Sequence, residues 1–240
     1  MKYIYFQFPG IENVGCAFTR KTSRDGGCDN LSARAGESPA VIASRREQLK
    51  NELGFDNWLE VGQIHGTDMV FHPQDFPQQD PPPQADALAT NNKSTGLVIK
   101  VADCQPVLLA HRSGTYIAAL HVGWRANRAN ALKLWISRFC NRYGLTPEDL
   151  VALRGPSLSP LKSEFVNFDQ EWGSEFASYF NEQERTMNLW ELTRNQLNRA
   201  GIPREQIFCL DLCTYTLQGM FFSYRRDRTM YRQAGLIWRQ

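Results

Sequence analysis

Apolar residues recur at helical spacing in three stretches of the chain. The clearest stretch is 131–143, where apolar side chains fall every three or four residues and Gly144 follows as a stop signal. The same spacing predicts helices over 171–180 and 189–200. A fourth helix is expected from about Pro39 to Leu53.

Runs rich in β-branched and aromatic residues predict the strands. They cover 14–19, 58–61, 96–101, 106–111, 116–122 and 207–212, after a first strand near the N-terminus. The short connection Arg112–Gly114 indicates an antiparallel hairpin and argues against a regular alternation of parallel strands and helices. Loops are expected at 20–30 and, rich in proline, at 73–84. The pattern predicts an α+β fold with mixed, largely antiparallel sheets, as a single domain over residues 1–240.

Composition narrows the class of protein. With 240 residues and 42% hydrophobic residues, the chain has enough material for a sizeable core. The 27 Lys and Arg residues against 25 Asp and Glu residues give a net charge of +2, so bulk charge indicates neither a nucleic-acid nor a membrane partner. No apolar run reaches the roughly 18 residues of a membrane helix, and six cysteines are too few for a disulfide scaffold. We therefore expect a cytoplasmic protein with reduced thiols.

The chain has four histidines, and two of them lie at the ends of predicted strands, next to polar residues or glycines. His65 ends a strand that carries Gln63 on the same face and stops at Gly66, and His121 ends another strand just before a glycine. Between them the chain breaks in a polar turn at Cys104. A Cys-His-His set leaves the fourth position of a tetrahedral zinc open, which is typical of catalytic sites. Because no two of these ligands are close in sequence, packed histidines and an inert cysteine are an open alternative at this point.

Three sequence blocks resemble the signature of the YfiH/laccase-domain family, whose members are also called polyphenol oxidases, purine nucleoside phosphorylases or peptidoglycan editing factors. The blocks read Gln-Ile-His-Gly at 63–66, Ala-Asp-Cys-Gln-Pro at 102–106 and His-Val-Gly-Trp-Arg at 121–125, and further blocks at 154–160 and 211–227 agree. The resemblance implies a layered α/β sandwich. It also implies that the zinc ligands are His65, Cys104 and His121.

The same resemblance implies an enzyme of purine nucleoside metabolism. The family's activities are phosphorolysis of adenosine, inosine, guanosine and methylthioadenosine to the free base and ribose 1-phosphate, and deamination of adenosine. The implied partners are a purine nucleoside and phosphate. The implied cofactor is Zn2+, and Cu2+ is a possible occupant of the site in vitro.

Specific side chains are expected to carry this chemistry. Phosphorolysis needs a held phosphate, and the arginine fork suits that anion. The expected catalytic residues are Cys104, His65, His121 and Arg125. The expected substrate-binding residues are Gln63, Arg45, Arg225 and Arg226.

Other functions stay open. A zinc-bound water or the Cys104 thiolate beside His121 would also suit an amidase that removes a misincorporated amino acid from a peptidoglycan precursor, UDP-MurNAc. A multicopper oxidase is disfavoured because four histidines cannot supply a copper cluster, although a single copper would still oxidise phenols weakly. A non-enzymatic module whose metal only holds strands together is the remaining alternative. The segments 126–128 and 161–164 depart from the family pattern, so substrate choice stays open, as does the oligomeric state.

Overall fold

A computed structural model describes residues 3–21, 29–73, 75 and 81–240. Parts of both predicted loops, 20–30 and 73–84, therefore lie outside the described residues. The first sheet has the order β1–β2–β13–β6–β3. Its strands are β1 (Tyr3–Gln7), β2 (Val14–Thr19), β13 (Gln233–Arg239), β6 (Thr95–Val101) and β3 (Asn57–Glu60).

The second sheet has the order β12–β9–β7–β8–β5–β4. Its strands are β12 (Ile207–Cys209), β9 (Leu150–Arg154), β7 (Gln105–His111), β8 (Ile117–Val122), β5 (Ala87–Thr90) and β4 (Met69–Phe71). The helices are α1 (Pro39–Leu53), α2 (Trp124–Arg128), α3 (Ala131–Tyr143), α4 (Phe168–Glu171), α5 (Leu189–Arg199) and α6 (Tyr224–Asp227). A two-stranded hairpin, β10 (Phe180–Asn181) with β11 (Thr186–Met187), lies apart from both sheets.

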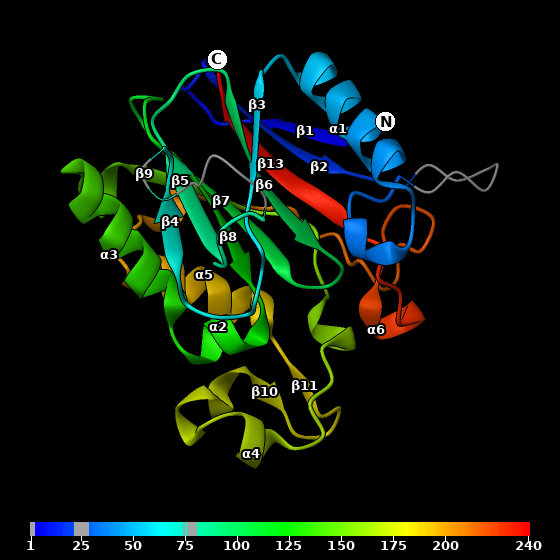
Figure 1. The fold of residues 1–240 in the computed structure, drawn as a ribbon. Helices are drawn as coiled ribbons and strands as arrows, with labels where there is room; N and C mark the ends of the chain where they lie inside the picture. The colour runs from blue at the N-terminus through cyan, green and yellow to red at the C-terminus, as the bar shows by residue number, and fades with distance from the viewer. Residues whose placement is uncertain (1–2, 22–28, 74, 76–80) are drawn as a thin grey trace.

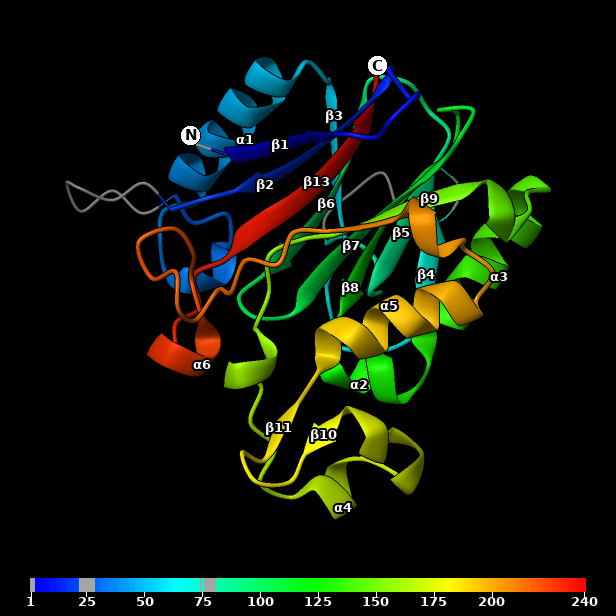
Figure 2. The same ribbon diagram turned by 180° about the vertical axis from the view of Figure 1, so that it is seen from behind.

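The two sheets pack face to face and helices cover their outer faces (Figure 1). Apolar side chains of β2, β6 and β13 meet those of β7, β8 and β9 in one buried cluster between the sheets. Helix α1 packs on the outer face of the first sheet, and α3 and α5 pack on the outer face of the second. Figure 2 shows the helix–sheet–sheet–helix layering from behind. The prediction of a layered, mixed α/β sandwich is therefore confirmed.

Strand pairing is mainly antiparallel, as predicted. The hairpin of β7 and β8 is antiparallel, and the parallel pairs are β3 with β6, β4 with β5, and β9 with β12. Helices α1 and α3 have the predicted bounds, and α5 ends one residue early. Among the described residues, no helix has both the length and the apolar character needed to cross a membrane.

The helix predicted over 171–180 is wrong. The chain instead forms the short α4, then an extended residue, Gly173 (φ −99°, ψ 163°), and a 3₁₀ helix from Ser174 to Tyr179. The aromatic side chains that produced the helical spacing turn inward, and Trp172 and Phe176 form a small core of their own. We call residues 163–188, which contain this core and the β10–β11 hairpin, the small lobe. The strand predicted over 207–212 is also shorter, because β12 ends at Cys209.

Trp135 connects α3 to the segment that carries His65. Its ring is fully buried, and its indole N–H donates a hydrogen bond of 2.8 Å to the carbonyl of Thr67. Trp238 is equally buried, but its indole N–H has no hydrogen-bond partner among the described residues. The two tryptophans therefore differ in one hydrogen bond at similar burial.

We expect Trp135→Phe to lower the free energy of unfolding more than Trp238→Phe, by about 1 kcal/mol, because only the first replacement leaves a partly buried carbonyl without its donor. The measurement is urea denaturation followed by circular dichroism. Both replacements remove a similar ring volume, so Trp238→Phe serves as the matched control. Equal losses would show that the bond to Thr67 contributes nothing.

Candidate metal centre

The ends of three strands lie side by side at one end of the second sheet. Strand β7 begins there and β8 ends there, because the two strands are antiparallel with Pro106 opposite His121. Strand β5 also begins there, with Ala87 opposite Leu120. The register therefore brings Cys104, His121 and Asp86 next to one another, although 17 or more residues separate them in the sequence.

His65, Cys104 and His121 form a set able to hold a metal ion. Their ligand atoms all lie within 4.8 Å of one another, and the two imidazole rings meet edge to face at 4.8 Å. A tetrahedral zinc needs its ligand atoms about 3.3–3.8 Å apart, so small side-chain movements close the set around an ion. A Cβ at position 123 would lie 3.3 Å from the Cys104 Sγ, so Gly123 keeps this space clear. His121 is buried and His65 is exposed, which leaves one side of the set open.

Asp86, which the sequence analysis did not identify, holds two of the three ligands. The carboxylate is fully buried and accepts a hydrogen bond of 2.7 Å from the His121 Nδ1. It also accepts the backbone N–H groups of Ile64, His65 and Gly66 at 3.2, 3.0 and 2.7 Å. This arrangement directs the His121 Nε2 toward the metal position, as carboxylate–histidine pairs do in metal sites. An aspartate within the apolar run Ala85–Ala89 was the available signal.

His65 does not end a strand, so the strand predicted to carry Gln63 and His65 on one face is wrong. Strand β3 ends at Glu60, and the following segment wraps around the Asp86 carboxylate, with His65 in the left-handed region at φ 61°. The reason is that three consecutive N–H groups satisfy one buried carboxylate, which a strand geometry cannot do. The Gln63 amide pairs in both directions with the backbone of Lys100, at 2.8 and 2.9 Å.

Electrostatics favour an ionised Cys104 and a protonated His121. Burial alone would raise the pKa of the Cys104 thiol, but the charge of His121 and hydrogen bonds from both histidines lower it to about 6. Burial alone would lower the pKa of His121, but the Cys104 thiolate and the Asp86 carboxylate raise it to about 9. Burial opposes ionisation of Asp86 too, yet its bonds to His121, Gly66 and His65 hold its pKa below the usual value. The Cys104 thiolate and the Asp86 carboxylate therefore stabilise a positive charge at His121, and a metal ion bound to its Nε2 would replace that proton.

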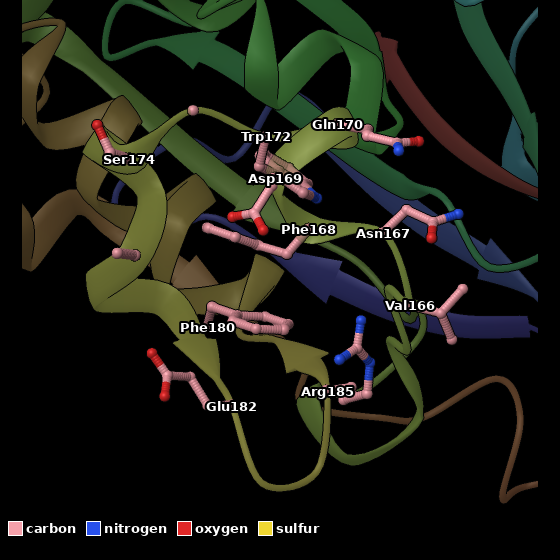
Figure 3. Close-up of a pocket in the computed structure, with 12 residues that line it drawn as sticks. Val166, Asn167, Phe168, Asp169, Gln170, Trp172, Ser174, Phe180, Glu182 and Arg185 are labelled. Atoms are coloured by element: carbon pink, nitrogen blue, oxygen red, sulfur yellow. The ribbon is translucent and has the colours of Figure 1, made fainter.

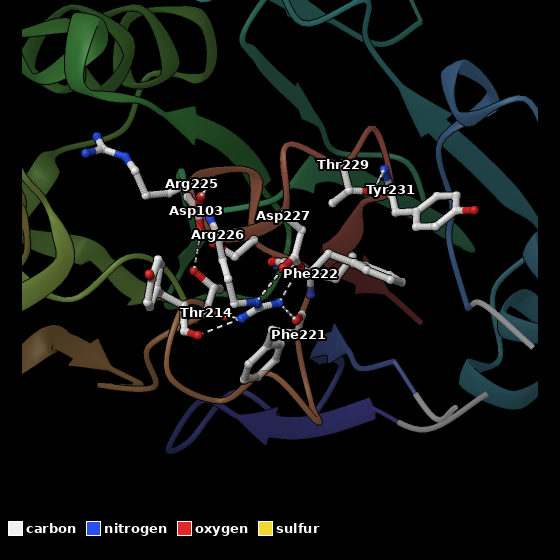
Figure 4. A network of polar contacts seen from close by, with 12 residues as sticks. Asp103, Thr214, Phe221, Phe222, Arg225, Arg226, Asp227, Thr229 and Tyr231 are labelled. Atoms are coloured by element: carbon white, nitrogen blue, oxygen red, sulfur yellow. Dashed lines mark hydrogen bonds and ion pairs between the residues drawn. The ribbon is translucent and has the colours of Figure 1, made fainter. Parts of the chain in front are cut away.

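Asp103 fixes the turn that presents Cys104. Its backbone is in the left-handed region at φ 95°, and its carboxylate accepts hydrogen bonds from the Thr214 hydroxyl and the Arg225 backbone N–H at 2.7 and 2.6 Å (Figure 4). Its carbonyl accepts the N–H of Leu158 at 2.9 Å. Strained backbone of this kind costs about 1–3 kcal/mol and persists where surrounding contacts enforce it. The turn is therefore held by segments far away in the sequence.

The arginines predicted to bind substrate differ in how many of their N–H groups already have partners within the protein. All five N–H groups of Arg226 are used, by Asp227 and by the carbonyls of Thr214, Tyr215 and Phe221 (Figure 4). Arg45 forms an ion pair of 2.9 Å with Glu37 and also bonds the Asn30 carbonyl. Arg225 donates to the Glu164 carbonyl at 2.9 Å. Arg125 is exposed, and its guanidinium lies over the Trp124 ring at 4.5 Å.

Asn127, in one of the two atypical segments, is the centre of a buried amide network. Its Nδ2 donates to Thr193 and Gln196 of α5, each at 2.9 Å, and its Oδ1 accepts from Gln105 at 3.3 Å. The Gln196 amide in turn donates to the Asn127 carbonyl at 2.7 Å. The network joins α2, which carries Arg125, to α5 and to the residue after Cys104.

The small lobe contains a separate cavity of about 740 Å³ (Figure 3). Its walls include the stacked rings of Phe168 and Phe180, 4.2 Å apart, and the charged side chains of Asp169, Glu182 and Arg185. None of the proposed metal ligands lines it. The lobe meets the metal centre through Trp124, whose ring lies 5.8 Å from those of Phe165 and Trp172.

Comparison with known proteins places this arrangement in one family. Residues 19–240 match the family model described as multi-copper polyphenol oxidoreductase laccase. The chain is 33% identical over 221 residues to purine nucleoside phosphorylase YfiH of Shigella flexneri, covering 87% of this chain and 85% of that protein. It is 30% identical over 239 residues to purine nucleoside phosphorylase of Haemophilus influenzae, covering 92% and 93%. The crystal structure of Neisseria meningitidis protein NMB0706 superposes with a TM-score of 0.84 at 27% identity, covering all of both chains.

We expect Asp86→Asn to weaken zinc binding by about 10- to 100-fold, the range typical for carboxylates that orient a histidine ligand. The amide has one oxygen for the four N–H donors that now share the carboxylate, so His121 and the His65 segment lose their fixed orientation. The measurement is competition with a chromophoric chelator on folded protein. Asp68→Asn, an exposed position close by on the same segment, is the control and should retain the wild-type affinity. Unchanged affinity in Asp86→Asn would contradict the role of this carboxylate.

Proposed function

The chain belongs to the YfiH/laccase-domain family, as the sequence blocks predicted, and on this premise we propose that it is a zinc-dependent purine nucleoside phosphorylase. The proposed substrates are adenosine, inosine, guanosine and methylthioadenosine, each with phosphate. The observation that carries the proposal is the three-residue set His65, Cys104 and His121, which is accessible from one side. The names of the related proteins support the same reaction.

The proposed reaction exchanges one bond at the sugar. An oxygen of phosphate bonds to C1′ of the ribose while the bond from C1′ to the purine nitrogen breaks, and the base leaves with that electron pair and takes up a proton. The sugar passes through a state with oxocarbenium character, as in glycoside cleavage generally. Zinc bound by the three ligands would supply a Lewis acid that stabilises negative charge in the site.

The chain's own residues have separate tasks in this proposal. Asp86 fixes the orientation of His121, and Gly123 leaves room beside Cys104. Arg125, exposed on α2 next to the metal ligands, remains a candidate for holding substrate. Gln63 and Arg45 would have to exchange a present partner for substrate, and Arg226 would have to give up one of five bonds. The guanidinium of Arg225 uses only its Nη1, on the Glu164 carbonyl. We also propose that the same metal supports deamination of adenosine, which the product analysis below would detect as inosine.

A second candidate function rests on a specific arrangement. Cys104, His121 and Asp86 form a thiol–imidazole–carboxylate series, which is the arrangement of cysteine hydrolases. It would suit the editing amidase, in which the Cys104 sulfur attacks the amide carbonyl and the amine leaves with a proton from His121. Water would then hydrolyse the thioester, releasing the carboxylic acid and the Cys104 thiol. Such a reaction needs no metal, whereas the proposed phosphorylase does. A copper-dependent phenol oxidase is the weakest candidate, because His72 and His111 lie outside the only cluster of metal-ligating side chains among the described residues.

We expect zinc-loaded protein to release adenine from adenosine only when phosphate is present, and Cys104→Ala to lower this rate at least 100-fold, because the metal loses its thiolate ligand. The measurement is chromatographic analysis of products. Cys140→Ala, the same replacement on the buried face of α3, is the control for folding and should retain most of the activity.

Other products would change the assignment. Inosine would mean that water is delivered to the purine ring, and phenol oxidation that appears only with copper would mean an adventitious activity. If folded, zinc-loaded protein gives neither adenine nor inosine, the nucleoside proposal is wrong. Release of serine from a mis-made UDP-MurNAc precursor by chelator-treated protein would then establish the amidase.

A further inference from the structure

Arg232 lies beside the metal centre and was not among the predicted site residues. In the antiparallel pairing of β13 with β6, Gln233 lies opposite Val101, so Arg232 borders the turn that leads to Cys104. The Arg232 backbone is fixed on both sides, because its N–H donates to the Asn30 side chain at 2.9 Å and its carbonyl accepts the Leu31 N–H at 3.1 Å. The position of the residue next to the turn is therefore set by two segments.

The guanidinium of Arg232 is held in place at one nitrogen only. Its Nη1 donates to the carbonyls of Thr229 and Tyr231, at 2.9 and 2.8 Å. Its Nε and Nη2 donate to no group in the described part of the chain, and no carboxylate of residues 3–21, 29–73, 75 and 81–240 forms an ion pair with it. This contrasts with Arg226, whose donors are all used, and with Arg45, which is paired with Glu37.

Two effects oppose the positive charge at this position. Burial is the largest effect and lowers the pKa of Arg232; the charges of Cys104, Asp103 and Tyr224 act in the opposite direction, and the charge of Arg34 adds a smaller lowering. Arg34 is exposed and lies in the 3₁₀ helix Ala33–Ala35, directly after the segment that pairs with the Arg232 backbone. Arg232 is half-buried, and no described carboxylate forms an ion pair with it, so a bound anion would stabilise its charge.

The charge balance changes further when a metal is bound. A divalent ion on His65, Cys104 and His121 would balance the charges of the Cys104 thiolate and the Asp86 carboxylate, so Arg232 would then border a neutral centre and no longer a negative one. The two free donors of Arg232 form the edge of the fork that binds oxyanions with two parallel hydrogen bonds. The stacking of its guanidinium near the Tyr224 ring, at 5.9 Å, limits the directions in which this fork can point.

We propose that Arg232, assisted by Arg34, is the anion-binding residue of the metal centre, and that its ligand is a tetrahedral oxyanion, namely the phosphate used in the reaction. This inference rests on the proposed phosphorylase function for the identity of the ligand. It assigns to Arg232 the task that the sequence suggested for Arg125, Arg45 and Arg225 or Arg226.

The test is calorimetric titration of inorganic phosphate into zinc-loaded full-length protein, which requires no turnover. We expect Arg232→Gln to weaken phosphate binding at least tenfold, Arg232→Lys to weaken it less because the charge remains without the fork, and Arg34→Gln to weaken it two- to fivefold. Arg228→Gln is the matched control, because Arg228 is exposed and its guanidinium also lies over the Tyr224 ring, at 5.5 Å. It should bind phosphate like the wild type.

Zinc content and the melting temperature show whether each variant folds and keeps its metal. Wild-type phosphate affinity in Arg232→Gln, or no phosphate binding by the wild type, would overturn the proposal. If Arg232→Gln fails to fold, wild-type affinity in Arg232→Lys would overturn it.

Product analysis separates this inference from the proposed function. Phosphate binding that is lost in Arg232→Gln, together with no nucleoside product from the wild type, would leave the anion site in place and remove the phosphorylase. Adenine release by the wild type with an unchanged KM for phosphate in Arg232→Gln would support the phosphorylase and exclude Arg232 as its phosphate-binding residue.

Discussion

The metal centre forms only if the Asp86 carboxylate is buried away from water. The rest of the site depends on the hydrogen bonds that compensate for the lost hydration of this charge. Four N–H donors surround it, one from His121 and three from the segment 64–66. An unpaired buried carboxylate would cost several kcal/mol, so the fold cannot keep Asp86 inside without also fixing both histidines. The energetic requirement of one charge therefore determines the orientation of two ligands on different segments.

The third ligand is fixed by an analogous arrangement on the other side of the turn. Asp103 precedes Cys104, and its carboxylate and carbonyl engage Thr214, Arg225 and Leu158. Both ligand-bearing turns thus contain a residue with positive φ, His65 and Asp103, held by hydrogen bonds from distant segments. Strain of this kind is retained where it presents functional groups, and here it brings both turns together beside the ends of β5, β7 and β8.

The arginines around the site show why counting charged residues in a sequence does not identify an anion site. Arg226 resembles a binding residue in the sequence, but its five donors close the loop around α6. Arg232 directly precedes Gln233, which pairs with Val101 at the start of the turn to Cys104. Two of its guanidinium nitrogens donate to no described residue. The difference arises from which backbone carbonyls the fold brings together, and no local pattern records it.

The sequence by itself determined the ligand types, the family and the elements with strong local signals. Helix α3 has the predicted bounds because its apolar stripe and terminal glycine are local features, and α1 has them because it begins at Pro39 and ends before Gly54. It did not determine β5, which is short and alanine-rich, nor the non-helical path of 171–180, where aromatic residues pack into the small lobe's own core. Only the tertiary structure decided the role of Asp86 and the loop at His65. It also decided which arginines have all their N–H groups bonded within the protein and which do not. Each of them depends on hydrogen-bond partners supplied by segments far away in the sequence, and periodicity and spacing describe neighbours in the chain.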